Sequence, residues 1–396
     1  MRSLEAHLDL VRALVGTMPH ETVALSDALG RVTVRDHGAI VPSPAFDNSA
    51  MDGYAIRVAD LAGASADSPV SLTVVDTARA GHPVDTTVGQ GQAARVMTGA
   101  PVPDGADAVV PQEIVVQDGG AATFHATPSV GAHIRRRGED AHVGDLVIPA
   151  GRTITARDVA AAAASGLGSL EVARRPRVGF LVTGDELVAP GETLGDGQIH
   201  DSNGAFLNAA LTALGAQPVP LSRVGDAPDA VWEALTGAPS VDLLITTGGA
   251  SVGDSDPVKA ALTGAGVDFT NVAMQPGKPQ GIGRVGGVPV LCFPGNPVAV
   301  VVSTELFVVA AVAHMAGQAE PAWQPAAALT GWSCPRGREQ VMPIVFEAGG
   351  VRPATDGGSG SHLAARVGRS AGLARVAADV DEVRAGDTVL VRRYVA

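Results

Sequence analysis

The feature that most constrains this chain is a regular alternation of strand-like and helix-like segments between Pro176 and Gly317. RVGFLVT and VDLLITT read as buried strands, and SNGAFLNAALTALG and DAPDAVWEALTG read as amphipathic helices. This order is typical of a doubly wound, mostly parallel α/β sheet with helices on both faces. Such sheets bind ligands at the carboxyl ends of their strands, so the loops that follow the strands are the first place to seek a site.

The remainder of the chain lacks this alternation of strands and helices, and we expect a multidomain α/β plus β protein. Short β-like runs separated by Gly, Pro and Asp fill the region from Val41 to about Arg137, and similar signals return near the C-terminus. Residues 154–166 predict a short helix capped by Thr155 and ended by Gly166. The predicted division is a helical and extended linker domain from 1–41 with 138–174, an inserted β module at 42–137, an α/β domain at 175–318 and a C-terminal β module at 319–396.

Composition excludes several classes of function. The formal net charge of −13 opposes binding to the phosphate backbone of nucleic acid. Only two cysteines occur, Cys292 and Cys334, so a reducing compartment fits. The N-terminus reads as an amphipathic helix rather than a signal peptide, and residues 303–305 interrupt the longest apolar run with Ser, Thr and Glu. We therefore expect a cytoplasmic protein with no membrane span.

Three loops at the ends of predicted strands are rich in chemistry: residues 183–186, 246–254 and 294–297. In the second loop, successive glycines free backbone N–H groups to converge on an anion, and Ser251 adds a hydroxyl donor. A phosphate or oxyanion would fit this loop. A plain strand-to-helix turn is the alternative.

Acidic residues crowd the same edge: Asp185, Glu186, Asp201, Asp226, Asp254 and Asp256. Carboxylates beside an anion site repel the anion unless a hard cation lies between them, and Mg²⁺ binds oxygen ligands of this kind together with phosphates. A helix N-cap is the alternative for each single residue, Asp226 and Asp254 above all. Lys278, one of two lysines, lies in a Pro/Gly-rich loop where it could receive an oxyanion, although a solvated lysine is nearly as good an interpretation.

Two further motifs are weaker. Residues 281–286 (GIGRVG) match a dinucleotide-binding pattern, but they open no helix, so a hairpin is predicted instead. Residues 249–253 (GASVG) match the nucleophile elbow of serine hydrolases. A hydrolase would need His314, which we expect to be buried in a helix, or His362, and it stays a minority hypothesis.

Seven strings in the chain together resemble the molybdopterin molybdenumtransferase family, bacterial molybdenum insertases related to the E domain of gephyrin. They are FDNSAMDGYA (46–55), TGAPVPDGADAVV (98–110), RRRGEDA (135–141), TGDEL (183–187), TTGGASVGDSD (246–256), PGKP (276–279) and FPGNPV (293–298). They occur in the family's order over nearly the whole chain. Signals after residue 319 are weaker, chiefly Arg338 and GSGSH (358–362).

The resemblance implies an elongated homodimer whose α/β domain, of the molybdenum-cofactor-binding type, faces the β module of the partner subunit. It implies Mg²⁺-dependent insertion of molybdate into adenylylated molybdopterin with release of AMP. Glu186, Asp226 and Asp256 would position Mg²⁺, and Asp52, Thr98 and Asp140 would approach from the partner subunit. The substrate-binding set implied is Asp185, Gly248, Gly249, Ser251, Asp254, Lys278, Pro294, Gly295, Asn296, Pro297, Arg338 and Ser359, among which Lys278, Arg338 and Ser359 would receive molybdate.

One position departs from the family pattern: Gln275 stands where relatives often carry a cation before PGKP. This departure puts the molybdate pocket in question but not the family. Two other functions stay open. The α/β domain also resembles the adenylyltransferase that makes the adenylylated pterin, and a non-catalytic scaffold is conceivable. Transfer partners in molybdenum cofactor synthesis are a further expectation.

Overall fold

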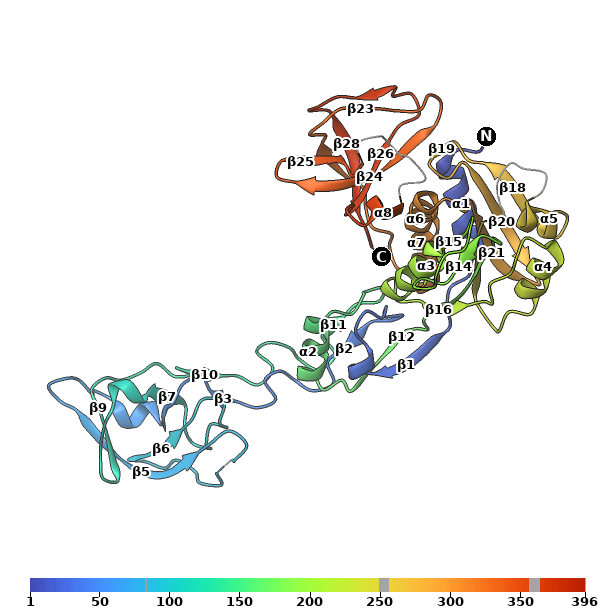
Figure 1. Ribbon diagram of the computed structural model, residues 1–396. Coiled ribbons are helices and arrows are strands. Elements are labelled where there is room, and N and C mark those ends of the chain that lie inside the picture. The colour runs from blue at the N-terminus through green and yellow to red at the C-terminus, as the bar shows by residue number, and fades with distance from the viewer. Residues whose placement is uncertain (83, 249–255, 356–363, 396) are drawn as a thin grey trace.

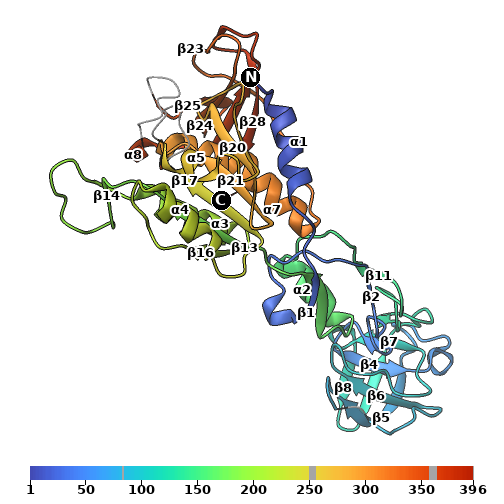
Figure 2. The same cartoon turned by 90° about the vertical axis from the view of Figure 1, so that its right-hand side faces the viewer.

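The computed structural model describes residues 1–82, 84–248, 256–355 and 364–395. The molecule is elongated (Figures 1 and 2). A β module occupies one end, a narrow neck follows, and the α/β and C-terminal domains lie together at the other end.

The predicted doubly wound sheet is present. Its six strands have the order β16-β13-β17-β21-β20-β18. Their bounds are β13 Arg177–Val182, β16 Gln217–Pro220, β17 Leu243–Thr247, β18 Val267–Asn271, β20 Pro279–Val285 and β21 Val288–Phe293. The strands from β16 to β21 pair in parallel, and β20 and β18 are antiparallel. Residues 281–286 lie in the β20–β21 hairpin, as predicted.

The helices of this domain follow the predicted segments. They are α3 Ser202–Ala213, α4 Pro228–Thr236, α5 Pro257–Leu262, α6 Pro297–Ser303 and α7 Val309–Ala316, and the short strands β14 Leu187–Val188 and β15 Ile199–His200 precede α3. A π-helical segment, η4 Thr304–Val308, joins α6 to α7. The continuous stretch Pro297–Ala316 is long and apolar enough to span a membrane, but 94% of its apolar window is buried inside the protein, as expected for a core helix.

The N-terminal helix α1 (Leu4–Leu14) joins this core. Leu4, Leu8 and Val11 are buried against side chains such as Val178 and Phe307. Ion pairs attach α1 and the C-terminal domain to each other. Arg375 binds Glu5 at 2.6 Å and Glu339 at 2.5 Å. The first helix is therefore part of the α/β core rather than of the neck.

The β module is built on the sheet β7-β4-β6-β5-β9-β8. Its strands are β4 Gly53–Ile56, β5 Val70–Ala78, β6 Gln92–Val96, β7 Ala108–Pro111, β8 Val116–Asp118 and β9 Ala121–Phe124, with the 3₁₀ turns η2 Val58–Leu61 and η3 Gln112–Ile114. Tyr54 and Phe124 pack edge to face in its core at a centroid distance of 6.0 Å. The pair β3 Asn48–Ser49 and β10 Ile134–Arg135 closes the module where the chain enters and leaves it.

The neck consists of segments from both sides of the β module. Strand β1 (His20–Ala24) pairs with β12 (Ser169–Ala173), and β2 (His37–Gly38) pairs with β11 (Leu146–Ile148). The turn η1 Leu25–Asp27 follows β1. Helix α2 (Ala156–Ala164) begins at Thr155, as predicted, with a reciprocal capping box between Thr155 and Asp158.

The C-terminal domain contains a second mixed sheet, β19-β24-β26-β28-β22, with β25 paired to β24. The bounds are β19 Met274–Gln275, β22 Gln324–Ala327, β23 Trp332–Ser333, β24 Glu339–Glu347, β25 Gly350–Pro353, α8 Ala364–Val367, β26 Gly372–Val376, β27 Glu382–Val383 and β28 Thr388–Arg393. Strand β19 comes from the α/β part of the chain, so this sheet joins the two domains. The residue boundaries between domains stay a prediction.

The capping box predicts a pH-dependent contribution to stability. Burial raises the pKa of Asp158, but hydrogen bonds from Thr155 and Arg152 outweigh burial and leave the pKa below the usual 3.8. A lowered folded-state pKa stabilises the fold above the unfolded pKa, and this stabilisation is lost as pH falls through the folded value. We expect Asp158→Ala to lower the free energy of unfolding by about 1 kcal/mol at pH 7 and by less in acid.

Urea unfolding at pH 7 and at pH 3 measures this difference. Asp67→Ala is the control, because Asp67 is exposed in the β module. An equal loss for Asp158→Ala at both pH values would contradict the proposed role of the ionised carboxylate.

Candidate functional site

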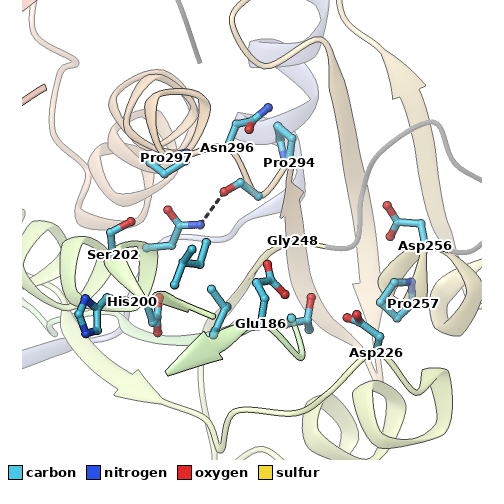
Figure 3. A pocket seen from close by; sticks show the side chains of 17 residues that line it. Glu186, His200, Ser202, Asp226, Gly248, Asp256, Pro257, Pro294, Asn296 and Pro297 are labelled. Atoms are coloured by element: carbon cyan, nitrogen blue, oxygen red, sulfur yellow. Dashed lines mark hydrogen bonds between the residues drawn. The ribbon is translucent and has the colours of Figure 1, made fainter. Parts of the chain in front are cut away.

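The main cavity lies at the carboxyl ends of β13, β17 and β21, where a doubly wound sheet is expected to bind ligands. Its volume is about 570 Å³. The lining includes Thr183 after β13, Gly248 after β17 and residues 294–297 after β21. Figure 3 shows Glu186 and Asp226 on one side of this pocket, with Pro294 and Asn296 across from them.

Close backbone contact holds these loops together. Gly248 has φ +87°, and a Cβ there would lie 2.6 Å from the carbonyl oxygen of Thr183. A Cβ on Gly295 would lie 3.1 Å from the Cα of Gly248. Only glycine at 248 combines the left-handed conformation with this approach. The two glycines therefore keep the three strand ends in contact.

The start of α3 forms another wall of the pocket. Asp201 caps the helix by accepting a hydrogen bond from the Gly204 N–H at 2.8 Å. The buried Asn203 side chain donates to the Gly295 carbonyl at 2.8 Å, the bond drawn in Figure 3. This bond ties α3 to the PGNP loop.

Four carboxylates line the pocket: Glu186, Asp201, Asp226 and Asp256. Asp226 is exposed, and its backbone N–H donates to Asp185 at 3.3 Å. The helix α4 is capped by Ala227 without a side-chain bond, so the N-cap alternative for Asp226 is wrong. Asp256 is buried and caps α5. No Lys or Arg lines the pocket within the described residues, and residues 249–255 contain none by sequence.

The strands beneath the pocket and their ends carry a buried thiol and buried hydroxyls. Burial, together with the negative charge of Asp256, raises the pKa of Cys292 to about 12, so this thiol is not a nucleophile at neutral pH. The hydroxyls of Thr183 and Thr247 are buried and have no hydrogen-bond partner in the described structure. A bound polar ligand could supply partners to this edge.

Most of the described residues that were expected around the sheet edge do line one pocket: Glu186, Asp226, Gly248, Asp256, Pro294, Gly295, Asn296 and Pro297. Gly249, Ser251, Asp254 and Ser359 lie outside the described residues. Sequence reasoning missed His200, Ser202, Asn203 and Pro257, which also line the pocket. The signal that could have found Ser202 and Asn203 is their place at the start of α3, and His200 lies in the short strand β15 just before it.

Lys278 and Arg338 do not line this pocket. Strand β19 pairs with β24, and the Glu339 N–H donates to the Ala273 carbonyl at 2.9 Å. This pairing places Arg338 beside the segment that leads to Lys278. The two cations that were expected to receive molybdate thus come from adjoining segments. Gln275 lies in β19, opposite Gln340 of β24.

Asp52 and Thr98 meet in the β module. Asp52 accepts hydrogen bonds from the Thr98 N–H at 2.7 Å and from the Thr98 hydroxyl at 2.8 Å. These bonds, the backbone bond first, lower the pKa of Asp52 below its usual value. Asp140 is exposed near the base of the module, where its N–H donates to the Ser43 carbonyl. Within one chain this module lies at the far end of the molecule from the pocket (Figure 1).

One expectation behind the hydrolase hypothesis, the burial of His314, is wrong. His314 was expected to be buried, but it is exposed on α7, because it occupies the one position of that helix segment that faces away from the core. The GASVG loop and His362 lie outside the described residues. His314 does not line the pocket.

Comparison with known proteins places this arrangement in a family. Residues 2–166 match the model described as "MoeA N-terminal region (domain I and II)", and residues 179–314 match "Probable molybdopterin binding domain". The chain is 40% identical to molybdopterin molybdenumtransferase 2 of Mycobacterium tuberculosis over 99% of both proteins. It is 33% identical to the molybdopterin molybdenumtransferase of Haemophilus influenzae over 94% of both.

Solved structures agree with this assignment. Two structures of the molybdopterin biosynthesis MoeA protein from Pyrococcus horikoshii superpose with TM-scores of 0.86 and 0.83, each at 28% identity and covering 100% of this chain. The sequence resemblance, the multidomain fold and the pocket at the carboxyl ends of the α/β strands all support the same assignment. The chain belongs to the molybdopterin molybdenumtransferase family.

Proposed function

We propose that this protein inserts molybdate into adenylylated molybdopterin and releases AMP and molybdenum cofactor. The observation that carries the proposal is a pocket lined by four carboxylates and, within the described residues, by no Lys or Arg, in a chain of the molybdenumtransferase family. An anionic substrate enters such a pocket only if a cation accompanies it. A cytoplasmic location fits a family of cofactor-synthesis enzymes.

We propose Mg²⁺ as that cation, bound by one or two of the carboxylates Glu186, Asp226 and Asp256 together with the substrate phosphates. Within the described residues, no three His, Cys, Asp or Glu side chains are close enough to bind a metal by themselves. This arrangement suits Mg²⁺, which usually takes one or two carboxylates and completes its shell with water and substrate phosphates. When bound, Mg²⁺ would neutralise charge on the phosphoanhydride.

The protein's own groups would position the substrate. Asn203 fixes the PGNP loop, and Asp185 fixes the backbone at Asp226. Water attacks the phosphoanhydride between AMP and the pterin phosphate, so that this bond breaks and AMP leaves. The two dithiolene thiols bind molybdenum and give their protons to one molybdate oxygen, which leaves as water, so the oxidation state of the metal does not change. No covalent enzyme intermediate is required, because positioning and electrostatics supply the acceleration. Lys278, Arg338 and Ser359 would hold the incoming molybdate, with Gln275 reducing the positive charge there.

We further propose a homodimer in which Asp52, Thr98 and Asp140 complete the pocket of the partner subunit. In one chain, the β module and the pocket lie at opposite ends of the molecule, so these residues reach a pocket only in a second copy (Figure 1). Proteins that accept the finished cofactor would be transfer partners of this dimer.

The first prediction concerns the carboxylates. Purified protein should release AMP from adenylylated molybdopterin only with molybdate and Mg²⁺ present. Asp226→Asn should slow release by at least about tenfold and raise the Mg²⁺ concentration needed, because a charged oxygen ligand is lost. Asp229→Asn, three residues away on the exposed face of α4, is the matched control. Release by wild-type protein that ignores molybdate would overturn the proposed function.

The second prediction concerns the shared site. Asp52→Ala and Asp226→Ala should each be inactive alone. Co-expressed with different tags and purified as mixed dimers, they should recover roughly half of wild-type activity per dimer, because each mixed dimer has one intact site and one site that lacks both carboxylates. Activity is measured as AMP release after tandem purification with two affinity tags. No recovery in a mixed dimer would rule out a site built from two subunits.

A further inference from the structure

A second cavity adjoins the main pocket, and we call it the α3 groove. It lies between α3 and the ends of β13 and β16, has a volume of about 490 Å³, and is lined by residues that include Phe180, Asp201, Asn208 and Arg223. Asp201 lines both the α3 groove and the main pocket. Asp201 therefore lies where the linings of the two cavities meet in the sequence, with one of its sides toward each.

The segment that carries Arg223 is fixed against the sheet. The Leu221 N–H donates to the Phe180 carbonyl at 3.0 Å, and Val224 forms a parallel bridge with Thr183. Arg223 is exposed between these anchors and makes no hydrogen bond or ion pair with the described residues. It is the only cation that lines either cavity within the described residues.

The Asp201 carboxylate is held at the junction. One oxygen accepts the Gly204 N–H at 2.8 Å. The other would lie 2.5 Å from a Cβ on residue 204, so only glycine there leaves the carboxylate in this position. An ionised carboxylate accepts about four hydrogen bonds in all, so Asp201 keeps capacity for a ligand.

The chemistry of the α3 groove distinguishes the two ring systems of the substrate. A pterin carries neighbouring N–H groups on its 2-amino-4-oxo edge, and this pair matches a carboxylate in the way that a guanidinium does. Adenine has no such adjacent pair of donors. The acceptors of the pyrimidine ring, N1 and O4, flank this donor pair and suit the Arg223 guanidinium and the Asn208 amide. Phe180 and Val182 give the groove an apolar floor for a planar ring.

We propose that the α3 groove binds the pterin ring of the substrate, with Asp201 on the N–H pair of its 2-amino-4-oxo edge and Arg223 on a neighbouring acceptor, N1 or O4. The phosphate and nucleotide portions then remain in the main pocket among Glu186, Asp226 and Asp256. The inference rests on the proposed function for the identity of the substrate. Arg223 and Asp201 become residues that determine specificity for a 2-amino-4-oxo ring.

The test is fluorescence titration of the full-length protein with 6-hydroxymethylpterin, with the corresponding lumazine, which has oxygen in place of the 2-amino group, and with AMP. Wild-type protein should prefer the pterin to the lumazine by about tenfold. Asp201→Asn and Arg223→Ala should each weaken pterin binding by about tenfold and leave AMP binding unchanged. Asn is as good an N-cap as Asp, so Asp201→Asn should preserve α3.

Asp229→Asn and Arg157→Ala are the matched controls, because both residues are exposed and lie outside the two cavities. Equal thermal unfolding midpoints should accompany every comparison. Pterin binding that is unchanged in both groove variants, or loss of AMP binding in its place, would overturn the assignment. The titration needs no turnover, so a failure of molybdate-dependent AMP release would be seen separately.

Discussion

The contact between backbones at the ends of β13, β17 and β21 is the constraint on which the rest of the site depends. Gly248 lies against Thr183 and Gly295 with no room for a side chain. Because the strand ends meet, side chains from the three loops share one cavity, although 111 positions separate Thr183 in the first loop from Pro294 in the third (294 − 183). The pocket is therefore a product of sheet topology, and the loops contribute the chemistry.

The distribution of charged side chains is the second feature that shapes the site. The chain is acidic as a whole, its main pocket is acidic, and its proposed substrates are anions. A site of this kind selects substrates that arrive with a divalent cation and rejects bare anions. The cations at Lys278 and Arg338 lie elsewhere, on segments joined by the β19–β24 pairing. A direct ion pair between these cations and the pocket carboxylates would neutralise both charges. Because they lie apart, the cations and the carboxylates each stay available to bind a ligand.

The sequence predicted the α/β sheet well, because buried strands and capped helices have clear periodic signals. It also predicted which loops gather at the sheet edge, since topology alone requires that. It did not predict the walls formed by Asn203 or the α3 groove, because these depend on how a helix packs over a strand. It placed His314 in a buried position, since a helix of mostly apolar residues hides which position faces outward. The proposed role of Asp52 at the pocket of a partner subunit could not be tested in a single chain.

The position of α1 has a consequence for how the protein is made on the ribosome. Its buried residues Leu4, Leu8 and Val11 pack against Val178, Phe307 and their neighbours, and Glu5 pairs with Arg375 of the C-terminal domain. All of these partners emerge long after the helix itself. During translation the apolar face of α1 is left without its native partners until the α/β domain has been made, and Glu5 is left without Arg375 until the C-terminal domain has been made. The beginning of this chain is thus one of the last parts to reach its native contacts.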